Sequence, residues 1–349
     1  MINIKHVASL LNKDQKISGL FLFLLILLSS FIDVLGVASI LPFMALLTNP
    51  QIIETNELFN FFYVYMSNFG IDNTNHFLFF VGVVVFLLLI ISLFFRAVTL
   101  YAQWRFVMIC EHTISKTLIK KYLYQPYEWF LNQNSANLGK SILSEVDIVI
   151  GSVIMSLLII FSQSIVVSSI ILLLIITNPI IALSAGLIFS ISYVSIFYFV
   201  KNILSLLGVE RLKANDGRYR TVNEAFGAYK DVKMKELEDT YINKFSDHAK
   251  IYAFNRAKSM VIGQFPRFLI EGIAFGGMLL AILVLMGRYN SFNTILPVLS
   301  LFAFAGYRLI PSFQQIYYGL TSIKFAKPSF DTIYYDYKNL NTLDEKRKN

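Results

Sequence analysis

Residues 96–124 read RAVTLYAQWRFVMICEHTISKTLIKKYLY and follow directly on an apolar run at 77–95. The stretch mixes apolar and polar residues, contains many good helix formers and is not a linker rich in Gly, Ser or Pro. A helix that begins in the apolar run can therefore continue through it, and about 20–25 further residues would extend it by about 30–40 Å. Residues 201–258 have the same character, so the sequence predicts two long helical arms.

The composition indicates an integral membrane protein. Of the 349 residues, 56% are hydrophobic and only 15% are charged, whereas a soluble domain carries about 25% charged residues. A helix needs about 20 apolar residues to cross roughly 30 Å of hydrocarbon. The sequence therefore predicts an all-α membrane protein with six long transmembrane helices and extended cytoplasmic helical arms. The expected spans are approximately 17–47, 77–95, 151–177, 179–200, 260–287 and 292–312.

The distribution of basic residues predicts the orientation of these helices. The loops at 48–76 and 177–179 contain no Lys or Arg, and the loop at 288–292 contains only Arg288. The positive-inside rule therefore places both termini and both arms in the cytoplasm, as expected for a multi-pass protein of the plasma membrane. The net charge of +8 is spread over loops between spans, which argues against a nucleic-acid-binding face.

Residues Gly139, Lys140 and Ser141 match the last three positions of a nucleotide-binding phosphate loop, but the rest of the pattern is incomplete. Its first glycine would stand where the chain has Asn134, and the residues before it are not strand-like. The one cysteine, Cys110, excludes an internal disulfide. The four histidines are scattered along the chain, so we expect no metal site. We also expect no catalytic residue and no cofactor in this chain itself.

The layout of six helices with long intracellular extensions resembles the transmembrane domain of an ABC exporter over nearly the whole chain. Three strings are similar to one branch, the flippases for lipid-linked oligosaccharides and related polysaccharide exporters: FIDVLGVASILPFMALLTNP (31–50), FPRFLIEGIAF (265–275) and AGYRLIPSFQQI (305–316). The resemblance implies a homodimer that moves such a lipid from the inner to the outer leaflet. Residues 1–330 would form the transmembrane domain, and 331–349 a cytoplasmic tail or a linker toward an ATPase domain.

The resemblance also implies two coupling turns that dock on ATPase domains, the second within GAYKDVKMKELEDTYINKF (227–245). The chain contains neither a phosphate loop nor an LSGGQ signature. We therefore expect no ATP hydrolysis by this chain alone, with ATP and Mg acting through a partner nucleotide-binding domain. The coupling residues would be Tyr127, Glu128, Trp129 and Phe130 in the first turn and Met234, Lys235, Glu236 and Leu237 in the second.

Few ionisable residues lie in or beside the spans, and each needs a reason, because a charge at the bilayer centre costs about 2.5–3.5 kcal/mol. Counting from the outer helix ends places Arg96, Arg267 and Arg308 at depths of about 28, 30 and 24 Å. This similar depth predicts a central cavity in which the three arginines bind a lipid pyrophosphate, because guanidinium donates paired hydrogen bonds to phosphate. Asp33 and Glu271 would be structural charge partners.

Two other interpretations of these arginines stay open. Their side chains can reach the inner headgroups at little cost, and Arg267 and Glu271 can neutralise each other one helical turn apart. Pro266 and Pro311 stand beside Arg267 and Arg308, and they predict bends in the fifth and sixth helices.

The outer segment NELFNFFYVYMSNFGI (56–71) is aromatic and too short to span the membrane. Its spacing predicts an amphipathic helix that lies on the outer leaflet. The resemblance adds contact with the lipid tail of the substrate; the alternative is that the helix only caps the bundle. The apolar residues that recur at intervals of three and four are Leu58, Phe61, Phe62, Tyr65 and Phe69.

Three rival functions remain at this point. The same fold can export another cargo, such as a peptide, a different lipid or a drug. An ion-coupled carrier would need buried carboxylates at mid-bilayer and an internal repeat, neither of which the sequence favours. A membrane scaffold without transport would use the cytoplasmic helices as an interaction stalk. The exposed aromatics at 127–130 fit either a docking anchor or packing within the bundle.

Overall fold

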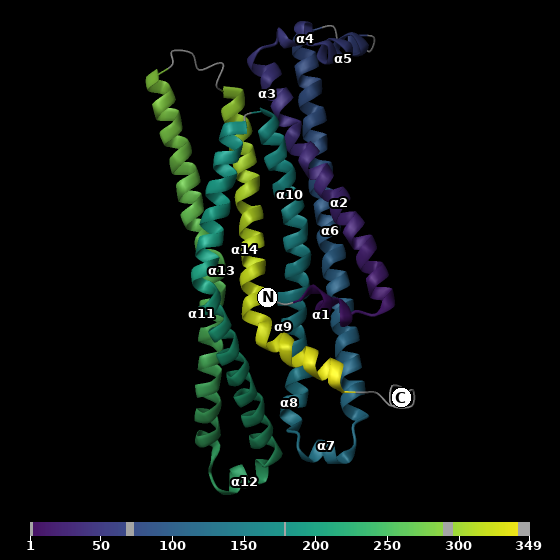
Figure 1. Cartoon of the computed structure of the whole chain (residues 1–349), viewed down its shortest axis with the longest axis vertical. Coiled ribbons are helices and arrows are strands. Elements are labelled where there is room, and N and C mark those ends of the chain that lie inside the picture. The colour runs from purple at the N-terminus through teal and green to yellow at the C-terminus, as the bar shows by residue number, and fades with distance from the viewer. Residues whose placement is uncertain (1–2, 68–72, 178, 289–295, 341–349) are drawn as a thin grey trace.

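The computed structural model describes residues 3–67, 73–177, 179–288 and 296–340, and every regular element in them is a helix (Figure 1). This confirms the predicted all-α class. Four helices are much longer than a membrane is thick; α6, for example, has 50 residues and measures about 75 Å. These long helices are α6 (Thr74–Leu123), α11 (Pro179–Gly227), α13 (Glu238–Arg288) and α14 (Leu296–Asn339).

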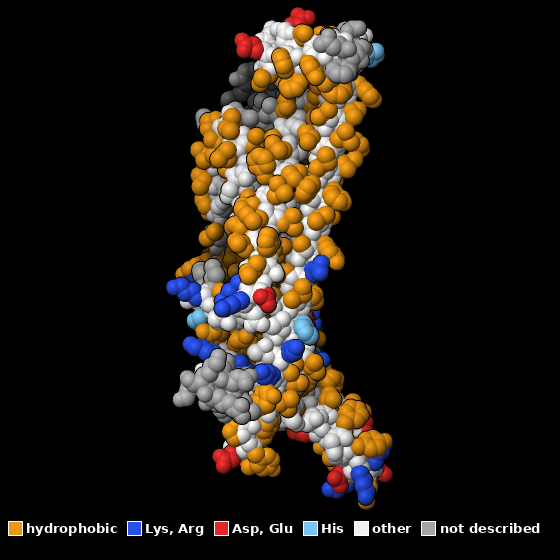
Figure 2. Space-filling view, turned by 90° about the vertical axis from the view of Figure 1, so that its right-hand side faces the viewer, with side chains coloured by type: hydrophobic (Ala, Val, Ile, Leu, Met, Phe, Trp, Pro, Cys, Tyr) orange, Lys and Arg blue, Asp and Glu red, His pale blue; other side chains and the backbone are white. Residues whose placement is uncertain are grey.

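Both predicted arms are helical hairpins that end in a short crossing helix. In the first arm, α6 leads through α7 (Tyr127–Leu131) into α8 (Ser135–Lys140), which begins the returning helix. In the second arm, α11 leads through α12 (Tyr229–Met234) into α13. The helices α7 and α12 lie at the lower end of Figure 1, far from the apolar part of the molecule. Figure 2 shows two separate extensions at this end.

The apolar part of the molecule agrees with the predicted spans as far as the described residues reach. Hydrophobic side chains cover the upper part of the face in Figure 2, whereas Lys, Arg, Asp and Glu gather mainly below it. Span 260–287 and the described part of span 292–312, from Leu296 onward, belong to α13 and α14, where many side chains lie outside the described residues. Among the described residues, the segments long and apolar enough to cross a membrane are Lys13–Gly36, Thr74–Leu123, Ser135–Ile176 and Ser190–Gly227.

The first predicted span, 17–47, is interrupted and not one continuous helix. Helix α2 (Lys13–Ala38) ends just before Ser39, and α3 (Ile40–Thr48) follows it. Pro42 explains the break, because it has no amide hydrogen for the carbonyl of Ala38 and its ring crowds that carbonyl. The Ser39 hydroxyl donates a hydrogen bond of 2.8 Å to the carbonyl of Gly36 at the helix end.

The returning helix of the first arm contains two π-helical segments that the sequence did not indicate. Helix α8 is followed by η1 (Ser141–Glu145), α9 (Val146–Val149), η2 (Ile150–Ile154) and α10 (Met155–Thr177). Each π segment adds a wider turn and so changes which residues face the neighbouring helices. The helical path begins well before the predicted span 151–177, as expected for an arm that continues into the cytoplasm.

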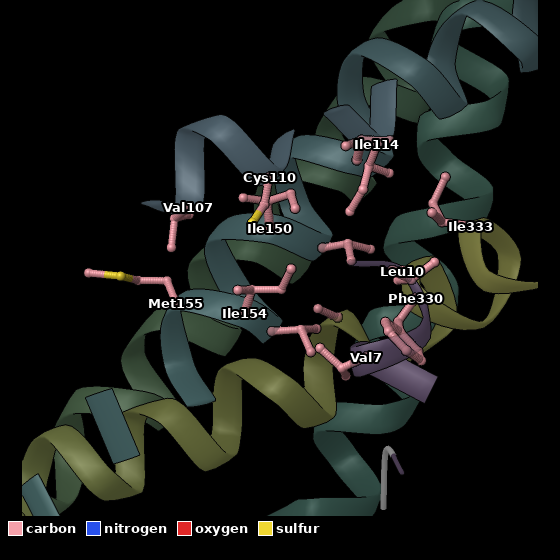
Figure 3. Packing of buried hydrophobic residues seen from close by; sticks show 14 of the residues in the cluster. Val7, Leu10, Val107, Cys110, Ile114, Ile150, Ile154, Met155, Phe330 and Ile333 are labelled. Carbon is pink, nitrogen blue, oxygen red and sulfur yellow. The ribbon is translucent and has the colours of Figure 1, made fainter. Parts of the chain in front are cut away.

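The largest buried apolar cluster lies where the arms join the apolar spans (Figure 3). The N-terminal helix α1 (Ile4–Ser9) contributes Val7, and α6 and η2 contribute residues such as Cys110 and Ile150. From α14 come Phe330 and Ile333, so this helix continues, packed into the core, across the domain boundary expected at residue 330. The cluster packs α1, α6, η2 and α14 against one another.

Candidate functional site

A polar cavity of about 150 Å³ lies between α2, α6, α10 and α14 and is lined by Arg96. Asp33 from α2, Gln163 from α10 and Gln315 from α14 also line it. Arg96 and Asp33 are the charged residues of the wall, and hydroxyl, amide and apolar side chains form the rest. The polar side chains of this wall, or water bound to them, can form hydrogen bonds to a polar group of a ligand. They do so inside an otherwise apolar part of the chain.

Asp33 is held in this wall by its packing against α6. Its carboxylate is buried and accepts a hydrogen bond of 2.7 Å from the Ser92 hydroxyl. The two helices approach closely here, because a Cβ placed on Gly36 would lie 3.4 Å from the Cβ of Ser92. The sequence pattern identified Asp33 as a polar residue in a span, and the structure places it beside Arg96 in one cavity.

Arg267 lies elsewhere, on α13, and forms an ion pair with Glu271 one turn away, with Nε and Oε1 2.6 Å apart. The Arg267 side chain is 52% exposed, and that of Glu271 is 28% exposed. The structure thus confirms Glu271 as the charge partner of Arg267. Arg267 does not line the cavity that contains Arg96, so these two predicted site residues do not share that pocket within this chain.

The third predicted arginine, Arg308, lies on α14 one turn before Pro311. Its side chain is outside the described residues, and so is all of Phe69 in the outer segment. The suggested role of Arg308 therefore rests on its place in the helix.

At Pro266 in α13, side chains that the sequence analysis missed form hydrogen bonds to the helix backbone. Pro266 has no amide hydrogen for the carbonyl of Ile262, and the Tyr317 hydroxyl donates to that carbonyl at 3.2 Å. The Gln314 amide donates to the neighbouring carbonyl of Gly263 at 2.7 Å. Gln314 in turn accepts a hydrogen bond of 3.2 Å from a tyrosine hydroxyl of α11, that of residue 193. A proline and a glutamine inside apolar runs were the available signal for this contact.

The outer segment forms helix α5 (Glu57–Ser67), which lies across the upper end of the bundle in Figure 1. Phe59, Tyr63 and Met66 pack against a buried cluster that includes Phe77. This face caps the bundle. The opposite side is also apolar and is exposed; it carries Leu58, Phe61, Phe62 and Tyr65. The segment forms the predicted helix, and the helix has both a packing face and an exposed apolar face.

The aromatic residues of α7, the helix in the first expected coupling turn, lie in two different environments. Tyr127 is 76% exposed, and Glu128 is exposed beside it. Trp129 instead stacks on Tyr122 at a ring distance of 5.8 Å, and Phe130 packs edge-on against Trp129 at 5.1 Å. Tyr127 therefore remains available for a partner, whereas Trp129 fixes α7 to the end of α6.

This anchoring continues into α14. The Tyr122 hydroxyl donates a hydrogen bond of 2.5 Å to Oδ2 of Asp336. Burial, together with the Asp336 charge, raises the pKa of Tyr122, and burial also raises the pKa of Asp336. The first coupling helix is thus connected through one tyrosine to the last helix.

Helix α12 and the turn that follows it contain the residues expected to form the second coupling turn. Met234 and Lys235 are exposed, and Glu236 has a φ of 49°, a left-handed conformation that costs free energy for a residue other than glycine. The Leu237 amide closes the turn by donating to the carbonyl of Val232 at 2.9 Å. This exposed, tightly closed turn matches the place expected for the second coupling residues.

A buried ion pair joins the two arms to α14 above the coupling helices. Arg211 of α11 and Glu145 of η1 are 2.9 Å apart, from Nη2 to Oε2, with only 1% and 0% of the side chains exposed. Arg211 also donates to the Ser329 hydroxyl on α14, and Asn215 donates to Glu145 Oε1 at 2.7 Å. Burial alone would raise the pKa of Glu145, but the Arg211 charge and these hydrogen bonds hold it below its usual value.

Close helix packing makes this contact possible. A Cβ on Gly208, one turn before Arg211, would overlap the backbone carbonyl of Phe325, so the backbone of α11 lies almost against that of α14. The sequence analysis did not identify Arg211 or Glu145, because they are far apart in the chain and neither lies in an apolar run.

A comparison with known protein families matches residues 20–310 to the ABC transporter transmembrane region. The match begins in α2 and ends in α14, so it includes both arms, both coupling helices and the cavity residues Asp33 and Arg96. The long continuous helices and the crossing helices at their far ends agree with it. The chain therefore belongs to the family of ABC transporter transmembrane regions.

Proposed function

We propose that this chain is the membrane-spanning subunit of an ATP-driven exporter that flips a lipid-linked oligosaccharide or a related polyprenyl-pyrophosphate lipid from the inner to the outer leaflet. Family membership supports the exporter subunit and its pairing with a nucleotide-binding domain. The cargo rests on one observation: Arg96 lines a polar cavity inside the apolar part of the chain, together with Asp33 and several hydroxyl and amide groups.

The chemistry of this wall suits a pyrophosphate that carries sugars. The Arg96 guanidinium can donate two hydrogen bonds to phosphate oxygens. The serine and glutamine side chains of the wall can hydrogen-bond to sugar hydroxyls. In a homodimer, two copies of Arg96, Arg267 and Arg308 would surround a shared path for the headgroup.

The arms supply the mechanical connection in this proposal. ATP binding by the partner domains brings the coupling helices together, and the long helices transmit that movement to the spans. The chain itself contributes no ATPase chemistry. The exposed apolar face of α5 would contact the polyprenyl tail of the lipid at the outer leaflet.

Flipping of a fluorescent polyprenyl-pyrophosphate oligosaccharide in proteoliposomes with the nucleotide-binding domain tests the proposal. Arg96→Gln should lower the flipping rate tenfold or more, because a charge-assisted hydrogen bond to phosphate is lost. Arg267→Gln combined with Arg308→Gln should also lower it. The matched control is Arg105→Gln, since Arg105 is exposed on the same helix and does not line the cavity. Wild-type flipping by Arg96→Gln at unchanged thermal stability would contradict the proposal.

ATPase stimulation separates this cargo from the other exporter cargoes. The lipid pyrophosphate should stimulate the assembled ATPase, and this stimulation should depend on Arg96. Stimulation by peptides or drugs, with none by the lipid, would instead favour an exporter of a different cargo within the same family.

A further inference from the structure

A second cavity, of about 140 Å³, lies between η2, α11, α13 and α14, and it is separate from the Arg96 cavity. Two arginines line it, Arg211 and Arg256, and no Asp or Glu is among its lining residues. A space that holds one water needs only about 10–15 Å³, so this cavity can admit a group larger than water. Its wall differs from that of the Arg96 cavity, which contains a carboxylate.

The two arginines are not equivalent. Arg211 already uses Nη1 and Nη2 for Glu145 and Ser329, but its buried Nε has no hydrogen-bond partner among the described residues. Arg256 is exposed and makes no ion pair or hydrogen bond within the described part of the chain. The wall therefore carries one guanidinium without a partner among the described residues, that of Arg256, and beside it the buried guanidinium of Arg211, whose Nε is closed off from the cavity.

Hydroxyl groups complete the set of donors. Ser152, Ser259 and Ser322 come from three different helices, and none of the three hydroxyls has a partner in the described residues. A carboxylate has two oxygens to accept these bonds, whereas a phosphate group presents three or more. The Arg256 guanidinium together with several hydroxyls therefore matches a phosphate better than a carboxylate.

The lining residues of the cavity lie at or beyond the ends of the predicted spans, on the side expected to be cytoplasmic. Ser152 stands at the cytoplasmic end of the predicted span 151–177, and Ser259 lies immediately before the span 260–287. Arg211 lies about 16 Å beyond the end of the span 179–200, at 1.5 Å per residue. A ligand can reach this level either from the cytosol or from the inner layer of lipid headgroups.

We infer that this cavity is an anion site that binds a phosphate group between Arg211 and Arg256. The site goes beyond the transport path of the proposed function and shares no lining residue with the Arg96 cavity. It also touches the Arg211–Glu145 pair that joins the two arms, so an occupied site would stabilise that junction.

The binding experiment uses the full chain in nanodiscs and two probes. In the first arm, inorganic phosphate is titrated by calorimetry into nanodiscs made of phosphatidylcholine alone. In the second, phosphatidic acid is added to the nanodisc lipid and bound lipids are counted by native mass spectrometry. Saturable binding of inorganic phosphate indicates a soluble ligand, and retention of phosphatidic acid alone indicates a lipid headgroup; either result supports the site.

The decisive variant is Arg256→Gln, which removes a charge without leaving a partner unpaired. It should weaken binding of the active probe at least tenfold, as expected for loss of a charge-assisted hydrogen bond. Lys258→Gln is the matched control, an exposed cation on the same helix that does not line the cavity. Arg96→Gln should leave the part of the binding that depends on Arg256 unchanged, which separates this site from the transport cavity.

Two results would overturn the inference. One is the failure of both probes to bind the wild-type chain. The other is equal binding by the wild type and by Arg256→Gln, with the variant shown to be folded by its thermal unfolding curve.

Discussion

Among single residues, Arg211 and Glu145 should have the largest effect on stability, because both are fully buried. Arg211→Met leaves the Glu145 carboxylate buried without its partner, and we expect a loss of about 3–5 kcal/mol in the free energy of unfolding. Replacing both residues, as Glu145→Leu with Arg211→Met, should recover most of this loss, since no charge is then left buried. Unfolding in detergent with a double-mutant cycle measures the coupling. Single costs that simply add would mean that the two side chains do not interact.

The same pair predicts a specific pH dependence. The pKa of Glu145 lies below its ordinary value of 4.5 in the folded chain, because Arg211 and the surrounding hydrogen bonds outweigh burial. The carboxylate therefore binds protons less readily when folded, and its stabilisation is complete above about pH 4.5 and is lost as the pH falls through the lower folded value. Stability measured from pH 7 downward should show an acid-sensitive component that the Glu145→Leu, Arg211→Met variant lacks. An identical pH profile in both proteins would refute this assignment.

Spacing along the chain explains which of these residues were predictable. Arg267 and Glu271 stand one helical turn apart, so their ion pair followed from sequence once a helix was assumed. Arg211 and Glu145 meet only because η1 and α11 pack side by side, and no local pattern encodes that contact. Arg96 and Asp33 were both noticed as charges in apolar runs, but their shared cavity depends on the packing of four helices.

Among the helices, the bend of α13 at Pro266 gives a direct test of how a missing backbone donor is replaced. Tyr317→Phe should leave the Ile262 carbonyl without a partner and cost about 1–3 kcal/mol. In a Pro266→Ala background the alanine amide can bond to that carbonyl, so the same change should cost less. Thermal unfolding of the four proteins of this cycle measures the difference. An equal loss of stability from Tyr317→Phe in both backgrounds would show that the tyrosine hydroxyl does not replace the missing amide hydrogen of Pro266.

Within one turn of α7, we expect Tyr127 to dock on the partner ATPase and Trp129 to pack against the rest of the chain. Tyr127→Ala should weaken the stimulation of the partner ATPase by substrate without lowering thermal stability, because the side chain is exposed. Trp129→Ala should destabilise the chain by at least about 1 kcal/mol, because it loses the stacking on Tyr122. Measuring ATPase stimulation and unfolding temperature for both variants distinguishes the roles. Reversed effects would assign docking to Trp129 instead.

The helices were more predictable than their interruptions. Long apolar runs and helix-forming arms indicated α6, α11 and α13, because composition alone favours those helices. The break at Ser39 had a signal in Pro42 that the span estimate passed over. The π segments η1 and η2 had none, since they arise from how the returning helix packs against its neighbours. The short helix α1 follows from tertiary packing of Val7 and Leu10.

For the whole molecule, the proposed transport mechanism depends on the stiffness of the arms. The main apolar cluster holds α1, α6, η2 and α14 together at the base of the arms, and the Arg211–Glu145 pair links the two arms just beyond it. Both coupling helices lie at the far ends of these supported hairpins (Figure 1). A displacement of α7 or α12 should therefore reach the spans instead of being lost in flexible loops.

Labelling at a single exposed position makes this movement measurable. Burial raises the pKa of Cys110 to about 12, so the native thiol stays protonated and unreactive toward thiol labels at neutral pH. A Met234→Cys variant then carries one accessible thiol, because Met234 is 73% exposed in the second coupling region.

The most direct test is the distance between spin labels on the two copies of Met234→Cys, recorded by pulsed electron resonance in the assembly with its nucleotide-binding domain. Adding a non-hydrolysable ATP analogue should shift the whole distance distribution to shorter values, as the coupling helices approach each other. A distribution that is the same with and without the nucleotide would contradict the mechanical link between ATP binding and the membrane helices.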